Sequence, residues 1–229
     1  MSRIARVIYR KYPHHVTLRG NYRQDVFRDD ADKEKYAEYL NEYATKYKLP
    51  IISYCLMSNH IHFIVVPMRD DSLAKTFNMM HMRYSQYFNK KYGLCSGHLW
   101  QGRFYSCVLD EPHLLAAVRY AERNPVRAGL VEKPWLWEWS SCTSHVGENN
   151  DVYIDCQDVA KYIDLSAKEW KNYVDDQDNE FFMNDLKRYT AAGYPYGSPT
   201  FIGKVEKVFG KKLTLLSRGR PKKNKKHAL

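Results

Sequence analysis

Residues 51–66 read IISYCLMSNHIHFIVV, and the expected fold of the chain follows from this stretch. Two short β-like runs, Ile51 to Met57 and His60 to Val66, meet at Ser58-Asn59, residue types that favour a turn. Pro67 ends the second run because a proline cannot donate a hydrogen bond to a sheet. The stretch therefore predicts a β-hairpin.

The second run of the hairpin has two chemically different faces. Side chains of a strand alternate between faces, so Ile61, Phe63 and Val65 are expected in the core. His60 and His62 then lie side by side on the opposite face, where two neutral imidazoles can share one divalent ion. A His-x-His pattern alone is weak, and two partly exposed strand histidines without a ligand are the more common outcome.

Strands and helices alternate on both sides of this hairpin. A strand is predicted over residues 14–20, and apolar residues recur at helical spacing over 31–47 and 72–91. Residues 97–108 are predicted to be extended, and a third helix runs from near Asp110 to about Asn124, before Pro125. The order β-α-β-β-α-β-α predicts an α+β fold with two helices on one face of an antiparallel sheet. The other face of the sheet is then expected to be free for a ligand.

The chain is predicted to have three parts. Residues 1–142 carry the pattern described above and are expected to form one domain, the one that would carry any chemistry of His60 and His62. Residues 143–217 form an accessory region, polar and acidic at first, with short helices expected near 181–191 and 199–209. Residues 218–229 are a basic tail that is expected to be disordered.

Net charge favours a polyanionic partner. The formal net charge is +10, and six of these charges lie in the tail, which leaves +4 for residues 1–217. Lysine and arginine on phosphates release condensed counterions, so this balance suits nucleic acid. The alternative is a charge excess that serves only solubility.

Cysteine usage and hydropathy indicate a reducing, cytoplasmic setting. The five cysteines are scattered without a Cys-x-x-Cys pair, which argues against a zinc ribbon and against a disulfide framework. No apolar run approaches the roughly 20 residues of a membrane span. The N-terminus has no apolar segment typical of a secretory signal.

Tyr120 and Asn124 are one turn apart on the third predicted helix and share a face. A tyrosine phenol, with an ordinary pKa of about 10, can attack a phosphate that a metal ion polarises. The amide oxygen of Asn124 is able to complete the metal shell. Taken alone, a tyrosine at the edge of the core and an asparagine at a helix end are the more common outcome, especially among 19 tyrosines.

Three motifs together resemble those of a known family. They are NHIHFIV at residues 59–65, LWQGRF at 99–104 and YAERNPVRAG at 120–129. In this order they resemble the bacterial REP-associated tyrosine transposases, relatives of the single-tyrosine transposases of small insertion sequences. The resemblance covers most of residues 14–142 and resumes near Gly193 and in the tail. Each motif is weak alone, whereas the three together are specific.

The resemblance implies a ferredoxin-like or RRM-like HUH nuclease fold and assigns roles to individual residues. The two histidines of the HUH motif fall on His60 and His62, the catalytic tyrosine on Tyr120 and a third metal ligand on Asn124. It implies Mg²⁺ or Mn²⁺ as cofactor and a 5′-phosphotyrosine intermediate. The implied activity is cutting and rejoining of single-stranded DNA, and no phosphate-binding loop for ATP is present.

The implied partner is single-stranded or hairpin DNA, as in the repetitive extragenic palindromes that family members recognise. Single strands are held by basic grooves and stacking aromatics. The candidate DNA contacts are Arg19, Arg23, Arg83, Trp100, Arg103 and Arg127, with Arg218, Arg220, Lys222 and Lys223 in an AT-hook-like tail. Trp100 is equally a core candidate.

Two other functions and two assembly states stay open. The chain could be a silent module that binds hairpin DNA or RNA without cutting, or a metallohydrolase that uses water as its nucleophile. Both a monomer and a homodimer fit the sequence. A nucleoid-associated place in the cytoplasm follows from the implied DNA partner.

Overall fold

The computed structural model describes residues 6–94, 97–149, 153–156, 162 and 165–215. The expected disorder and DNA contacts of the basic tail therefore lie outside the described residues.

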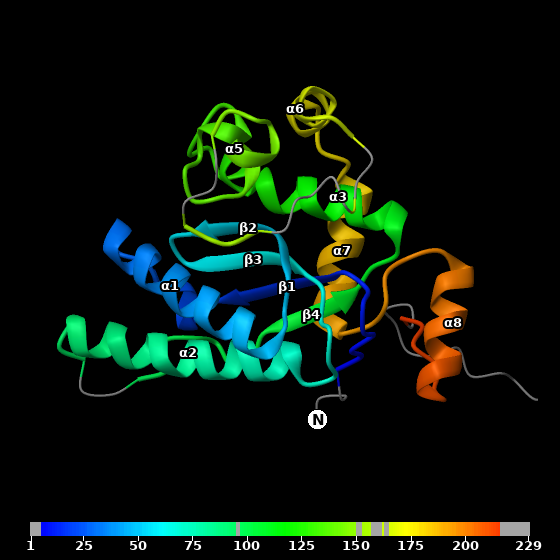
Figure 1. Cartoon of the computed structure of the whole chain (residues 1–229), viewed down its shortest axis with the longest axis horizontal. Coiled ribbons are helices and arrows are strands. Elements are labelled where there is room, and N and C mark those ends of the chain that lie inside the picture. Colours follow the sequence, from blue (N-terminus) through cyan, green and yellow to red (C-terminus); the bar gives the residue numbers. More distant parts are fainter. Residues whose placement is uncertain (1–5, 95–96, 150–152, 157–161, 163–164, 216–229) are drawn as a thin grey trace, which may run out of the picture.

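Four strands form one antiparallel sheet in the order β2-β3-β1-β4 (Figure 1). They are β1 (His14–Arg19), β2 (Ile51–Met57), β3 (His60–Val65) and β4 (Tyr105–Val108). The predicted hairpin of β2 and β3 is confirmed, as is the α+β class. The strand that carries His60 and His62 lies inside the sheet, between β2 and β1.

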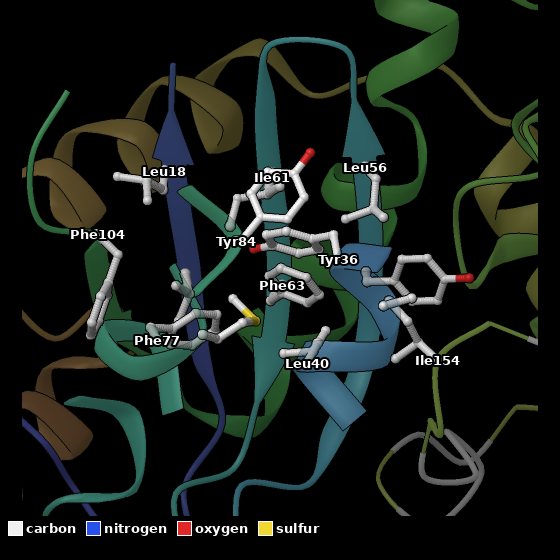
Figure 2. Close-up of a cluster of buried hydrophobic side chains, with 14 of the residues drawn as sticks. Leu18, Tyr36, Leu40, Leu56, Ile61, Phe63, Phe77, Tyr84, Phe104 and Ile154 are labelled. Carbon is white, nitrogen blue, oxygen red and sulfur yellow. The ribbon is translucent and has the colours of Figure 1, made fainter. Parts of the chain in front are cut away.

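Helices α1 (Asp30–Tyr47) and α2 (Ser72–Lys91) pack together on one face of the sheet, as predicted. Their aromatic residues meet the inward face of β3, where Phe63 lies beside Tyr36 and Phe77 (Figure 2). The alternation of β3 explains this, because Ile61, Phe63 and Val65 are all fully buried in this core.

The opposite face of the sheet is not free, so that prediction was wrong. Helix α3 (Glu111–Glu122) packs on β2 and β3, and α7 (Glu180–Ala192) packs on β4 and β1. Between and beyond them lie the short α4 (Asn124–Arg127) and α5 (Cys142–His145), and α6 (Ala167–Asp175). What stays open on this face is a cavity between α3, α7 and the sheet.

A second hydrophobic core, on the face of the sheet that α3 and α7 cover, includes residues from both sides of residue 142. Trp170, Val174 and Leu186 are buried together with Ile52 and Ile64 of the sheet. The division of the chain at residue 142 stays a prediction, but the packing on this face includes residues from both sides of it. Trp170 thus packs as a core residue.

The remaining elements lie at the periphery. The single-turn helices η1 (Asn21–Arg23) and η2 (Pro134–Leu136) are short connections, and α8 (Pro199–Phe209) packs on the N-terminal segment through Val7 and Phe201. The helices predicted near 181–191 and 199–209 correspond to α7 and α8.

Candidate active site

A cavity of about 700 Å³ lies on the sheet face that α3 and α7 cover. Strands β1 and β3, helices α3 and α4, and helix α7 all contribute to its walls. The polar and charged side chains that line it are His15, Thr17, Arg19, His60, His62, Gln101, Tyr105, Tyr120, Asn124, Arg127, Lys187 and Thr190. The four residues to which the sequence assigned the chemistry are therefore together.

His60 and His62 lie side by side, with ring centroids 5.2 Å apart and the ring planes at 84°. Nδ1 of His60 is 2.6 Å from Oδ1 of Asn59, an acceptor, so Nδ1 carries the proton of the neutral imidazole. The lone pair of His60 is then on Nε2. Burial and the positive charge of Arg19 lower the pKa of His60 to about 4, against a weaker opposite effect of Asn124.

The imidazole of His62 forms its hydrogen bond with a second histidine, His15. Its Nδ1 is 2.9 Å from Nε2 of His15, and Nδ1 of His15 is 2.8 Å from Oγ1 of Thr190. Burial lowers the pKa of His15 to about 3 and holds the pKa of His62 well below its ordinary value. Both rings are therefore uncharged near neutral pH.

Tyr120 faces the histidines from α3. Its ring centroid is 5.3 Å from that of His62 and 5.8 Å from that of His15, with both ring pairs close to perpendicular. The side chain is only 5% exposed. Burial raises the pKa of the phenol, whereas the charges of Arg127 and Arg19 act in the opposite direction.

Asn124 owes its orientation to Pro125. In a regular helix the carbonyl of Ala121 would accept from the backbone N–H of residue 125, which proline lacks. The side-chain amide of Asn124 donates instead to the carbonyls of Ala121 and Tyr120, both at 3.0 Å. Because its NH₂ group is committed, the amide oxygen Oδ1 is the atom left for a ligand.

This donor set fits a divalent cation. Two imidazole nitrogens and one amide oxygen would leave coordination positions on a divalent ion open for phosphate and water. Within the described part of the chain, no group of three His, Cys, Asp or Glu residues has metal-binding geometry. A third protein ligand would thus have to be a residue such as Asn124.

Four of the predicted DNA-contact arginines lie in or near the cavity or on the exposed turn after β1. Arg19 and Arg127 line the cavity, and Arg103 lines a smaller neighbouring cavity that shares Tyr105 and Thr190 with it. Arg23 is exposed in η1, next to Asn59, which donates to its carbonyl.

Two of the predicted contacts lie away from the cavity. Trp100 is 7% exposed and packs on His81, Tyr36 and Tyr84 in the core beneath the sheet, because its indole fills the space between α1 and α2. Arg83 pairs with Glu42 and covers the ring of Tyr39, also on the far side of the sheet from the cavity.

Two features of the site, and one exposed residue that does not line the cavity, were not predicted. Lys187 and Thr190 reach the cavity from α7, and Nζ of Lys187 is 6.0 Å from the ring centroid of Tyr120. His15 contacts His62 across two strands. Tyr22, in η1 beside Arg23, is 92% exposed with a positive φ of 50°.

Comparison with known proteins places the chain in a family. Residues 8–124 match the family model described as IS200-like transposases. Because this segment spans half of the chain, the protein belongs to the IS200-like transposase family. Both the nucleophile candidate and Asn124 fall within the matched segment.

Two relatives add to this assignment. A Haemophilus influenzae protein, provisionally named a REP-associated tyrosine transposase, is 27% identical over 149 residues, 57% of this chain and 84% of its own length. A solved structure of a REP-associated tyrosine transposase bound to a REP hairpin has a TM-score of 0.52 at 21% identity. It covers 73% of this chain and 96% of its own. The resemblance inferred from the three motifs is confirmed, and the structural match supports the α+β fold.

None of the helices in the described residues is both long enough and apolar enough to cross a membrane.

Proposed function

We propose that this protein is a metal-dependent single-strand DNA endonuclease and strand transferase that acts on hairpin DNA through a phosphotyrosine on Tyr120. The observation that carries the proposal is the cavity in which Tyr120 faces His60, His62 and Asn124 within one chain of a transposase family. The hairpin seen with a structural relative supports this class of substrate.

Different side chains of the site would bind the metal ion and contact the phosphate during phosphoryl transfer. A Mg²⁺ or Mn²⁺ ion held by His60, His62 and Asn124 would polarise the phosphorus by drawing charge from a non-bridging oxygen. Arg19 and Lys187 line the cavity, and no carboxylate of the described residues forms an ion pair with either. These two side chains are the cations that can meet the phosphate, whereas Arg127 is already paired with Asp178.

The proposed step conserves the energy of the phosphodiester bond. The hydroxyl oxygen of Tyr120 attacks phosphorus, the bond from phosphorus to the 3′ oxygen breaks, and the phenol proton ends on that oxygen. The products are a 5′-phosphotyrosine and a free 3′-hydroxyl. Attack by a 3′-hydroxyl on the phosphotyrosine reverses the step and joins strands without ATP.

Covalent trapping tests this proposal. Labelled hairpin DNA is incubated with the protein and Mn²⁺ or Mg²⁺ and separated on a denaturing gel. We expect a metal-dependent protein–DNA band that is absent for Tyr120→Phe and for His60→Ala/His62→Ala. Tyr47→Phe, on the far side of the sheet, is the matched control and should form the band.

The other outcomes point to other functions. Cutting that persists in Tyr120→Phe and leaves no adduct would mean that water is the nucleophile, as in a metallohydrolase. Tight hairpin binding without cutting by the intact protein would favour a binding module.

A further inference from the structure

The metal-binding face of His62 depends on a buried hydrogen-bond chain that begins in α7. Thr190 contacts His15 at 2.8 Å, His15 contacts His62 at 2.9 Å, and the two imidazole planes are 11° apart. Thr190 and His15 are each 1% exposed, so water does not compete for these bonds. The register explains the contact: His15 pairs with Ile64 and is thus a diagonal neighbour of His62.

The chain of bonds has only two possible directions. An uncharged imidazole carries one N–H, so each ring donates on one side and accepts on the other. If Thr190 accepts from His15, then His15 accepts from Nδ1 of His62, and Nε2 of His62 has a free lone pair. If Thr190 donates, every bond reverses, and Nε2 of His62 carries a proton that prevents it from binding a cation.

Only the first direction leaves Nε2 of His62 able to bind a cation, and the surroundings of Thr190 allow it, although either atom of its contact with Cys107 can be the donor. The hydroxyl of Thr190 is 3.1 Å from the sulfur of Cys107, a second partner that can take the hydroxyl proton. The oxygen lone pairs of Thr190 then face Nδ1 of His15. His60 needs no such chain, because the neighbouring Asn59 fixes its tautomer directly.

We propose that His15 and Thr190 are positioning residues that hold His62 as the Nδ1–H tautomer, so that α7 completes the metal site. The proposal rests on the proposed metal-dependent function for its purpose, but the tautomer itself is a property of the protein without metal. Thr190 lies well beyond residues 8–124, the segment that defines the family. The accessory region thus acquires a role in the site.

The first test reads the tautomer directly. In the metal-free protein, ¹⁵N chemical shifts of the His62 ring should show a proton on Nδ1 and a bare Nε2. We expect Thr190→Ser to keep this pattern and Thr190→Val, which has no hydroxyl, to produce a mixture of tautomers. Finding the proton of His62 on Nε2 in the wild-type protein would overturn the proposal.

The second test measures Mn²⁺ affinity by titration without DNA. Loss of a hydrogen-bond partner behind a metal ligand typically costs about 10- to 100-fold in affinity, and we expect this loss for His15→Phe and a smaller one for Thr190→Val. His81→Phe is the matched control, because His81 is also buried with one ring–hydroxyl bond, to Tyr36, on the other sheet face. Thr76→Val is the corresponding control for Thr190.

The outcomes separate this proposal from the proposed function. Mn²⁺ affinities of His15→Phe and Thr190→Val equal to those of their controls would overturn the positioning role. A wild-type protein with the expected His62 tautomer that forms no DNA adduct would leave the positioning role supported and the proposed nuclease function refuted.

Discussion

Lys187 is the cation of α7 that faces the candidate nucleophile. A charge-assisted contact contributes about 1.5–3 kcal/mol, so we expect Lys187→Gln to slow single-turnover cleavage of hairpin DNA roughly 10- to 150-fold. Rapid-quench measurement at saturating protein gives this rate. Lys207→Gln on α8 removes the same charge from an exposed position away from the cavity and should leave the rate unchanged. If both substitutions slow cleavage equally, Lys187 acts only through the net charge of the protein and not through a contact at the site.

Tyr22 is an exposed aromatic residue held in an unfavourable backbone conformation. Its φ of 50° and that of Arg23 at 62° cost energy for residues other than glycine, and such strain gathers at functional sites. Stacking of one base on an aromatic side chain contributes about 1–3 kcal/mol, so we expect Tyr22→Ala to weaken hairpin binding by roughly 5- to 150-fold.

Fluorescence anisotropy with labelled hairpin measures this effect. Tyr22→Trp should retain affinity, and Phe181→Ala, which removes an aromatic ring that is 88% exposed elsewhere, should not change it. Unchanged affinity in Tyr22→Ala would exclude the stacking role.

At the level of single residues, the sequence predicts on which face of the sheet a residue lies, because this depends only on alternation along one strand. The period of two is sufficient to place His60 and His62 on one face and Phe63 in the core. It is not sufficient to pair His15 with His62, because this contact depends on the register between β1 and β3. Lys187 has no local signal among 36 lysines and arginines, and its position follows only from how α7 packs.

The turn after β1 leaves no room for a side chain at Gly20. Gly20 donates to the carbonyl of Asn59, next to His60, and a Cβ at Gly20 would lie 2.2 Å from the backbone oxygen of Gln24. We therefore expect Gly20→Ala to shift the turn, to lower the free energy of unfolding by about 1–3 kcal/mol, and to weaken Mn²⁺ binding.

Urea unfolding and Mn²⁺ titration check this prediction. Gly203→Ala is the matched control, since a Cβ there meets open space within α8 and alanine favours a helix by up to about 1 kcal/mol. A Gly20→Ala protein as stable as Gly203→Ala would show that the turn adjusts without cost.

Helices are predicted where their apolar stripe is strong. Residues 72–91 were predicted as a helix and form α2 with the same bounds, because Leu73, Phe77, Met80 and Tyr84 recur at helical spacing. Helix α6 was missed within the acidic region, although Trp170 and Val174, four residues apart, form its buried stripe. Helix α7 was predicted as a helix but not as a wall of the site, because an amphipathic pattern does not say which sheet face it covers.

The whole molecule contains several histidines that are uncharged when folded. Burial lowers the pKa of His14 and His60 to about 4 and of His15 and His81 to about 3, below the ordinary value of 6.5. Between these values the unfolded chain binds protons that the folded chain does not, so stability must fall as the pH falls from 6.5 towards 4. Each histidine contributes a slope of about 1.4 kcal/mol per pH unit.

Urea unfolding at pH 7.5, 6 and 5 measures this slope. Replacing buried His81 by phenylalanine should reduce the slope, whereas His98→Gln, at an exposed position, should not. Stability that stays constant from pH 6.5 to 4.5 would mean that these rings are protonated without unfolding.

The packing of α7 against β4 and β1 has a consequence for how such a protein diverges. Tyr120, the proposed nucleophile, lies with His60 and His62 in the segment that matches the family. Thr190, which contacts His15, and Lys187, beside Tyr120, lie more than sixty residues after the end of that segment. A recombination event that replaced the C-terminal part of the chain would keep every motif residue and still alter the site. A lineage can in this way weaken or silence the proposed DNA cutting without any change in the motifs by which its members are recognised.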